Sequence, residues 1–163
     1  MQEKKYQGVD DTVNYAIAII KKHSGDDILK YFDNKKLSEI FDFISKDVRY
    51  LTDPMKVKYL DGGSIELLRS PEKTMYELAG DCDDKAILAG SLFQRYNIPY
   101  RMAVISNKEN KKFHHIFPEV KLNNKWKTFD ATYEWNKMFE NKPFTKKEVF
   151  YPGDKKIIKE EIK

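Results

Sequence analysis

The stretch GDCDDKAILAGSLFQ, residues 80–94, contains the only cysteine of the chain. Cys82 lies among three aspartates, Asp81, Asp83 and Asp84. A cysteine that attacks a substrate does so as a thiolate, and neighbouring negative charges oppose the loss of its proton. The stretch therefore raises two alternatives: Cys82 is a nucleophile, or it is a small buried residue beside solvated acids.

The residues around Cys82 predict the start of a buried helix. Asp81 is a typical N-cap, and its D-x-x-D spacing with Asp84 places acids in the first turn, where they are favourable. Apolar residues then cover most sides of the helix: Ala86, Ile87, Ala89, Gly90, Leu92 and Phe93. Asn97 and Pro99 end it. Cys82 thus occupies the first turn, where free backbone N–H groups and the helix dipole lower the pKa of a thiol.

Beyond Pro99 the apolar pattern changes from helical spacing to alternation, which predicts strands. The three predicted strands are residues 100–106, 113–122 and 125–132. Asn123 and Asn124 form a tight turn between the last two, and the short connections favour an antiparallel meander. With the turn centred there, Asp130 lies roughly opposite residue 117. It is then about two residues from His115, and such diagonal neighbours are within side-chain reach.

The first third of the chain predicts helices. One apolar face falls in residues 10–23, with Asp10 or Asp11 as the cap, and a second falls in residues 37–48. The first face consists of Val13, Ala16, Ile17 and Ile20, and the second of Leu37, Ile40, Phe41, Ile44 and Val48. Thr52-Asp53-Pro54 closes the second helix, because the residue before a proline is pushed out of the helical region.

The remaining segments complete an α+β layout, with helices first and a sheet second. Residues 55–73 are predicted to be irregular, and Thr74 with Glu77 indicates a capping box for a short turn. Residues 155–163 predict either a short closing helix or a frayed tail. The 163 residues suit a single domain. Its parts are a helical layer at about 10–50, a core at about 51–135 and a C-terminal extension at about 136–163.

Composition excludes several classes of partner and cofactor. The net charge of +4 comes from 30 basic and 26 acidic residues spread along the chain, so we expect no nucleic-acid partner. One cysteine makes no internal disulfide and no cysteine-based zinc site, and the calcium-loop pattern D-x-D-x-D-G is absent, so we expect no metal and no cofactor. The polar start and the short apolar run at 15–20 predict no signal peptide, no membrane span and a cytoplasmic location.

Cys82, His114 or His115, and Asp130 form a candidate catalytic set. Side chains alternate along a strand, so His114 and His115 point to opposite faces and only one of them can face Cys82. An aspartate beside a histidine can accept from Nδ1–H and hold the other ring nitrogen toward the thiol. This is the arrangement of nucleophile, base and orienting group that serves covalent acyl transfer.

Three segments together carry a family resemblance: GDCDDKAILAGSLFQRYNIPYRMAVI, then HHIFPEV, then KWKTFDAT. They resemble the transglutaminase-like superfamily, which has a papain-like Cys–His–Asp core, and within it a small branch from bacterial and tailed-phage genomes. The resemblance covers roughly residues 45–133. It implies a central helix packed on an antiparallel sheet.

The resemblance also implies roles for individual residues. Cys82 takes the nucleophile position and Asp130 the orienting position, and His115 takes the base position because it fits the H-x-aromatic-x-E-V frame. The backbone N–H of Cys82 would form part of the oxyanion hole, with a second donor expected at residues 76–81. Pro118 departs from a regular strand because it has no N–H to donate, so we expect an edge or a bulge there.

Two functions lead at this level, ahead of a third, a peptide-binding module that uses the same fold with an inactive site. The first is a cysteine-dependent acyl-transfer enzyme acting on amide or peptide bonds of a protein or peptide substrate, with a peptidase or amidase favoured over a cross-linking transglutaminase. The second is a non-catalytic structural or assembly protein, such as a phage virion component, that binds a protein partner and uses the same fold without turnover. The sequence leaves the oligomeric state open.

Overall fold

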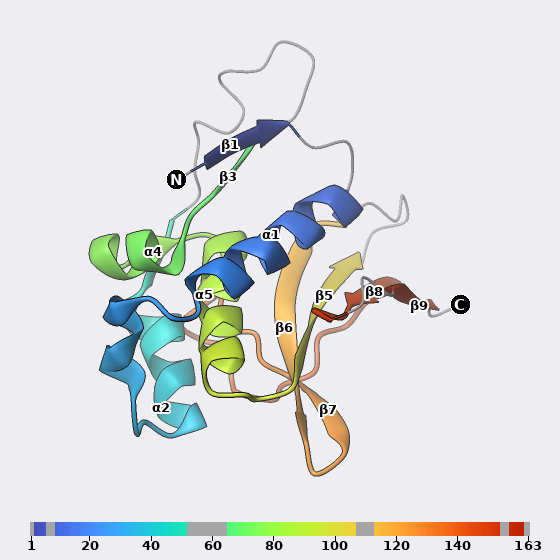
Figure 1. The fold of residues 1–163 in the computed structure, drawn as a ribbon. Helices are drawn as coiled ribbons and strands as arrows, with labels where there is room; N and C mark the ends of the chain where they lie inside the picture. Colours follow the sequence, from blue (N-terminus) through green and yellow to red (C-terminus); the bar gives the residue numbers. More distant parts are fainter. Residues whose placement is uncertain (1, 6–8, 52–64, 107–112, 154–156, 162–163) are drawn as a thin grey trace.

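Helix α5, Cys82–Arg95, lies at the centre of the fold (Figure 1). The computed structural model describes residues 2–5, 9–51, 65–106, 113–153 and 157–161. The helix begins as predicted: Asp81 Oδ1 accepts from the Asp84 N–H at 3.2 Å, and Asp84 Oδ2 accepts from the Asp81 N–H at 3.2 Å. It ends before Asn97, which has the left-handed φ of 58° that asparagine tolerates.

Helix α1, Val9–His23, packs against α5. Its predicted apolar face is buried, since Val13 and Ile20 are fully inaccessible. The helix starts at Val9, so the prediction that Asp10 or Asp11 caps it is wrong, and both lie within its first turn. The short helix η1, Asp27–Phe32, follows after Gly25.

The second predicted helix is shorter than expected. Helix α2, Leu37–Asp42, continues as the π-helical turn η2, Phe43–Asp47, and the predicted apolar stripe is buried at Ile44 and Val48. Val48 then turns to extended geometry, and β2, Arg49–Tyr50, pairs in parallel with β4, Ala79–Gly80. Backbone pairing with β4 therefore ends the helix before residues 52–54, which lie outside the described residues.

Strand β3 and helix α4 lead into the central helix. Strand β3, Ile65–Leu68, pairs antiparallel with β1, Gln2–Lys5, so the prediction of irregular structure is wrong where residues 55–73 are described. Helix α4, Pro71–Glu77, is capped by Ser70, whose side chain accepts from the Lys73 N–H at 3.2 Å. The predicted Thr74/Glu77 capping box is therefore wrong, because Ser70 and the proline after it start the helix earlier.

A five-stranded sheet packs against α5 in the order β7-β6-β5-β8-β9. Its strands are β5, Tyr100–Ser106; β6, His115–Leu122; β7, Lys125–Thr128; β8, Lys146–Phe150; and β9, Ile157–Glu161. All its pairs are antiparallel. Asn123 and Asn124 both have positive φ, which confirms the predicted tight turn.

Strand β7 ends earlier than the predicted residue 132. Thr128 pairs with Glu119, and the last backbone contact is the Phe129 N–H donating to the Pro118 carbonyl at 2.9 Å. Pro118 cannot return that hydrogen bond, so the ladder stops there, as expected from its missing N–H. The chain after Phe129 is thereby released from the sheet.

The C-terminal strands differ from the prediction. Strand β8 lies beside β5, and β9 lies beside β8, so residues 157–161 are neither a closing helix nor a frayed tail. Val149 and Phe150 of β8 are buried against the sheet's two faces. Pairing with β5 stabilises a segment whose five residues are too few to show clear alternation.

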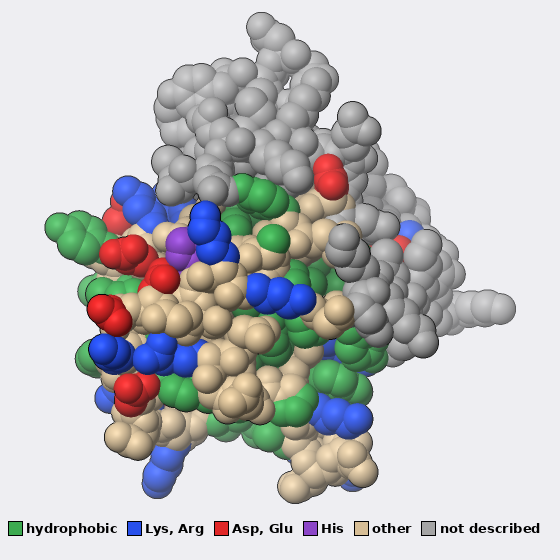
Figure 2. Space-filling model, in the orientation of Figure 1, with side chains coloured by type: hydrophobic (Ala, Val, Ile, Leu, Met, Phe, Trp, Pro, Cys, Tyr) green, Lys and Arg blue, Asp and Glu red, His purple; other side chains and the backbone are tan. Residues whose placement is uncertain are grey.

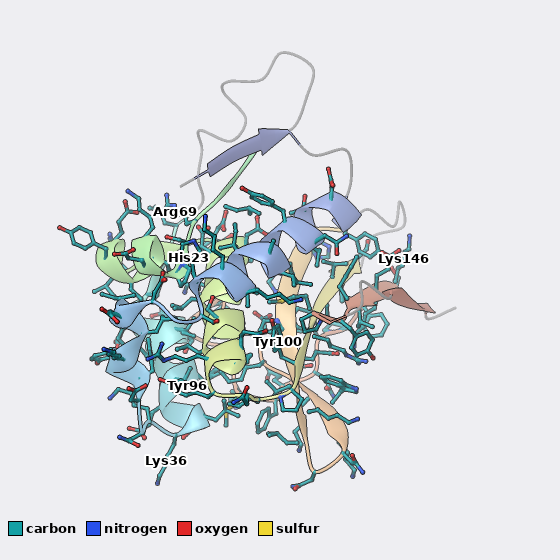
Figure 3. All side chains as sticks on the ribbon, in the orientation of Figure 1. His23, Lys36, Arg69, Tyr96, Tyr100 and Lys146 are labelled. Atoms are coloured by element: carbon teal, nitrogen blue, oxygen red, sulfur yellow. The ribbon has the colours of Figure 1, made fainter. Side chains whose placement is uncertain are left out.

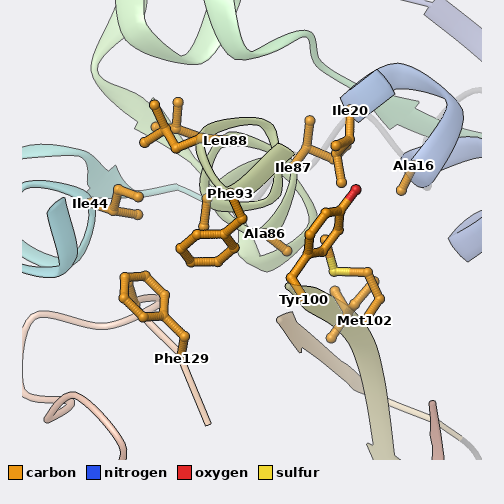
Figure 4. Packing of buried hydrophobic residues seen from close by; sticks show 14 of the residues in the cluster. Ala16, Ile20, Ile44, Ala86, Ile87, Leu88, Phe93, Tyr100, Met102 and Phe129 are labelled. Atoms are coloured by element: carbon orange, nitrogen blue, oxygen red, sulfur yellow. The ribbon is translucent and has the colours of Figure 1, made fainter. Parts of the chain in front are cut away.

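The main core lies between α5, α1 and the sheet (Figure 4). Gly90 allows the close approach, because a Cβ there would lie 2.5 Å from Ile20 Cδ1 of α1 and 2.8 Å from Met102 Cε of β5. On the other side of α5, Phe129 packs edge-to-face on Phe93. The central helix is thus enclosed by apolar contacts on most sides, as its sequence predicts.

The described surface is charged and mixed. Figure 2 shows lysines and arginines interspersed with aspartates and glutamates on the face that α1 and α2 present. Within the described part of the chain, no helix has the length and apolar character needed to cross a membrane.

Candidate active site

His115 and Asp130 contact one another directly. His115 Nε2 lies 2.7 Å from Asp130 Oδ2, and the two side chains are 13% and 2% exposed. The observed register of β6 and β7 is the predicted one, and it brings Asp130 beside the start of β6. The predicted contact through Nδ1 is wrong: Nε2 is farther from the main chain and reaches across to the segment that follows β7. Nδ1 is the ring nitrogen left for other contacts.

Asp130 is held in one orientation by Thr132. The Thr132 hydroxyl and backbone N–H both donate to Asp130 Oδ1, at 2.6 Å and 3.2 Å. Lys142 Nζ lies 3.7 Å from Oδ2. Burial alone would raise the pKa of Asp130, but the hydrogen bonds from His115 and Thr132 and the charge of Lys142 outweigh it and lower the pKa. Asp130 is therefore a carboxylate that accepts from His115.

Cys82 is the first residue of α5 and is half-buried. Its thiol lies 3.9 Å from Asp83 Oδ1, so a local acid does contact it. The pKa of Tyr50 is raised by burial, by its hydrogen bond with Tyr133, and by the charges of Tyr133, Cys82 and Asp81. Tyr50 therefore lies within electrostatic range of the Cys82 thiol.

Aromatic rings connect Tyr50 with His115. The Tyr133 ring lies 4.8 Å from the Tyr50 ring and 6.5 Å from the His115 ring, to which it is nearly parallel at 12°. Trp135 stacks on Tyr133 at 4.7 Å and 3°, and it is 70% exposed. The His115–Asp130 pair thus borders an aromatic group made of Tyr50, Tyr133 and Trp135, whereas the thiol's contact given above is with Asp83.

Sequence reasoning missed Tyr50, Tyr133 and Thr132 as members of this site. Tyr76, in the segment expected to supply an oxyanion donor, is 85% exposed. Thr132 had a usable signal, because it completes the D-x-T pattern that ends the last predicted strand. Tyr50 had none, because its neighbourhood depends on the pairing of β2 with β4. His114 is exposed, in keeping with the choice of His115.

Asp84 is a buried acid and the second member of the capping box with Asp81. Burial and the charge of Asp81 raise the pKa of Asp84 to about 7. Hydrogen bonds from the backbone N–H groups of Asp81 and Arg69, together with the charge of Arg69, lower the pKa but do not outweigh this rise. Arg69 Nε lies 3.8 Å from Asp84 Oδ2. Figure 3 labels Arg69, which lies beside α4. Gly80 makes room for the Asp84 side chain, because a Cβ at Gly80 would lie 2.7 Å from Asp84 Cβ.

Asp84→Asn is expected to flatten the pH dependence of the free energy of unfolding between about pH 4 and pH 7. An unfolded aspartate loses its proton near pH 3.9, whereas the folded pKa is about 7. The folded state holds the extra proton between these values, so this stabilisation is complete below about pH 4 and is lost as the pH rises to about 7. Each pKa unit of difference corresponds to about 1.4 kcal/mol.

Urea unfolding near pH 4.5 and pH 7.5 measures this difference. Asp42→Asn is the matched control, since Asp42 is an exposed carboxylate 3.7 Å from Lys46 on the surface. An equal loss of stability with rising pH in wild type and Asp84→Asn would show that Asp84 is ionised throughout.

Among the described residues, no grouping of three or more histidine, cysteine, aspartate or glutamate side chains is arranged to hold a metal ion. The chemistry that the described side chains offer is that of a thiol, an imidazole and a carboxylate.

Comparison with known families identifies the superfamily to which this chain belongs. The profile of the transglutaminase-like superfamily matches residues 21–131, which is more than half of the sequence, so the chain belongs to this superfamily. Three solved chains match. One is a protein from Cytophaga hutchinsonii, provisionally named a cysteine protease, with 24% identity and a TM-score of 0.45. The match covers 71% of this chain and 37% of that one. No curated protein matches.

Proposed function

We propose that the protein is a cysteine-dependent acyl-transfer enzyme that acts on amide or peptide bonds of a protein or peptide. The observation that carries the proposal is the 2.7 Å contact between His115 Nε2 and Asp130 Oδ2, which leaves Nδ1 as the basic nitrogen. Membership of the transglutaminase-like superfamily and the position of Cys82 at the start of a central helix support it.

The reaction proceeds through an acyl-thioester. His115 Nδ1 takes the proton of the Cys82 thiol, and the sulfur attacks the carbonyl carbon of the substrate amide. The C–N bond breaks as His115 returns the proton to the leaving amine. Water or a second amine then attacks the thioester carbonyl carbon while His115 accepts its proton. The C–S bond breaks, and His115 returns the proton to the sulfur, which restores the Cys82 thiol.

His115 is also the counter-ion that the thiolate requires. Asp83 contacts the thiol and opposes its ionisation, whereas the N-terminal end of α5 favours a negative charge. An imidazolium held by Asp130 supplies the missing positive charge. The Cys82 backbone N–H is the donor that we assign to the developing oxyanion.

Hydrolysis and amine transfer share these steps and differ only in the group that attacks the thioester. We favour hydrolysis, so that the enzyme is a peptidase or amidase, because water can attack the thioester without a second substrate-binding site. Adding a primary amine to a reaction separates the two, since a cross-linker incorporates the amine and a hydrolase releases the free acid.

Alkylation of Cys82 by iodoacetamide tests the proposal. The chain has one cysteine, so all labelling reports on that thiol. We expect the wild-type rate near pH 6 to exceed that of free glutathione at least about tenfold, because a free thiol has a pKa of about 8.5 and is mostly protonated there. His115→Gln should lower the alkylation rate to that of glutathione. His114→Gln, which alters the exposed neighbouring histidine, should keep the wild-type rate.

Acyl-enzyme formation gives the second measurement. With p-nitrophenyl acetate, wild-type protein should release one burst equivalent of p-nitrophenol and gain one acetyl group on Cys82, and Cys82→Ala should do neither. If the wild-type thiol alkylates no faster than glutathione and forms no acyl-enzyme, the proposed enzymatic function is contradicted. The result would then favour the non-catalytic assembly role.

A further inference from the structure

We propose that Lys85 is a positioning residue that fixes the segment carrying Asp130 against the helix that carries Cys82. The inference rests on the proposed function, because it concerns the relative placement of the nucleophile and its base. Lys85 is absent from the catalytic set that the sequence predicts, and it touches none of the reacting atoms.

The hydrogen bond made by the Lys85 side chain joins two elements of the candidate site. Lys85 follows Cys82 by three residues on α5, which places both on neighbouring positions of one helix surface. Lys85 Nζ donates to the Thr132 carbonyl at 2.8 Å. Thr132 in turn donates twice to Asp130 Oδ1, and Asp130 contacts His115. A hydrogen-bonded path therefore runs from the nucleophile's helix to the base.

Packing supports the same connection. Lys85 is only 2% exposed. Lys85, Asp130 and Thr132 line one small cavity between α5 and the end of β7. Asn136 Nδ2 donates to the Asp130 carbonyl at 3.2 Å. Side-chain hydrogen bonds therefore reach this segment at the carbonyls of both Asp130 and Thr132, which restricts how far Asp130 can turn.

Neither burial nor the helix favours a lysine at this position. Burial lowers the pKa of Lys85 to about 8, although the charges of Asp130 and Glu134 raise it. A cation in the first turns of a helix also opposes the helix dipole. Because an apolar residue would suit this buried surface better, the feature that lysine adds is its long donor to Thr132 and a positive charge near Asp130.

Lys85→Met tests the inference, because methionine has similar length and neither donor nor charge. We expect alkylation of Cys82 near pH 6 to slow at least tenfold, and the pH profile of the rate to move toward that of a free thiol, while the far-UV circular dichroism is unchanged. The control is Lys73→Met, which removes a half-exposed ion pair with Glu77 on α4 and should leave the profile at its wild-type position.

A merely structural lysine would lower the melting temperature without moving that profile. A Lys85→Met profile that overlays the wild-type profile therefore overturns the inference while leaving the proposed function intact. A wild-type thiol as slow as glutathione overturns both. Lys85→Arg keeps the charge and the donors, so it should retain more of the wild-type rate than Lys85→Met. If neither variant folds, Lys85 serves folding and the inference also fails.

Discussion

Asp130→Asn is expected to form acyl-enzyme about 10²–10³ times more slowly than the wild-type protein, with its fold retained. The substitution keeps the shape of the side chain and removes its charge. The effect is large for two reasons. The amide would present an NH₂ donor to His115 where the carboxylate presents an acceptor oxygen, and the charge that stabilises the imidazolium would be lost.

The orientation of the new amide follows from Thr132. Its backbone N–H and hydroxyl both donate to Asp130 Oδ1, so an asparagine would place its carbonyl oxygen there. Its NH₂ group would then occupy the position of Oδ2 and donate to His115 Nε2. Nε2 would become the acceptor and Nδ1 would carry the proton, so the nitrogen assigned as the base would no longer accept one.

The burst of p-nitrophenol in a stopped-flow experiment measures the acylation rate directly. Asp33→Asn is the matched control: Asp33 also accepts a hydrogen bond, from the Tyr96 hydroxyl at the opposite end of α5. It should leave the burst unchanged. A burst rate for Asp130→Asn within threefold of wild type would contradict the assigned role of Asp130.

Phe129→Ala is expected to lower the free energy of unfolding by about 3–5 kcal/mol. Phe129 is fully buried beside Asp130. It packs edge-to-face on Phe41 at 5.1 Å between ring centroids and on Phe93 at 4.9 Å. The alanine would leave a cavity and remove two aromatic contacts, because rings from α2 and α5 meet on this one side chain.

Urea unfolding followed by circular dichroism measures this loss. Tyr76→Ala is the control, since Tyr76 is 85% exposed on α4, and its effect should stay within about 0.5 kcal/mol. A loss below about 1 kcal/mol for Phe129→Ala would mean that the surrounding core closes over the vacated space.

The central helix and the hairpin that positions Asp130 could be predicted from sequence because their signals are local. Asp81 and Asp84 lie three residues apart and cap one another. Asn123 and Asn124 fix the turn and, with it, the register of the two strands. Each inference needed only residues close together in the chain.

Other features depend on distant residues and left no local signal. Strand β2 ends the second helix because β4, about 30 residues later, pairs with it. Strand β8 forms because it pairs with the open edge of β5, and β9 forms because it pairs with β8 in turn. The ring nitrogen that contacts Asp130 depends on how far the imidazole must reach, which strand alternation does not specify. Lys85 did carry a signal, as a basic residue in the N-terminal half of a helix otherwise predicted to be buried.

The order of strands in the sheet affects how the chain folds as it is synthesised. Strand β5 is buried along its whole length, and it pairs with β6 on one edge and with β8 on the other. On the ribosome, β6 emerges soon after β5, whereas Lys146, the partner of Ser106, emerges about 40 residues later. Until then the nascent chain exposes an apolar strand edge of the kind that pairs with other chains. The second edge of β5 is therefore paired only after β8 has been synthesised.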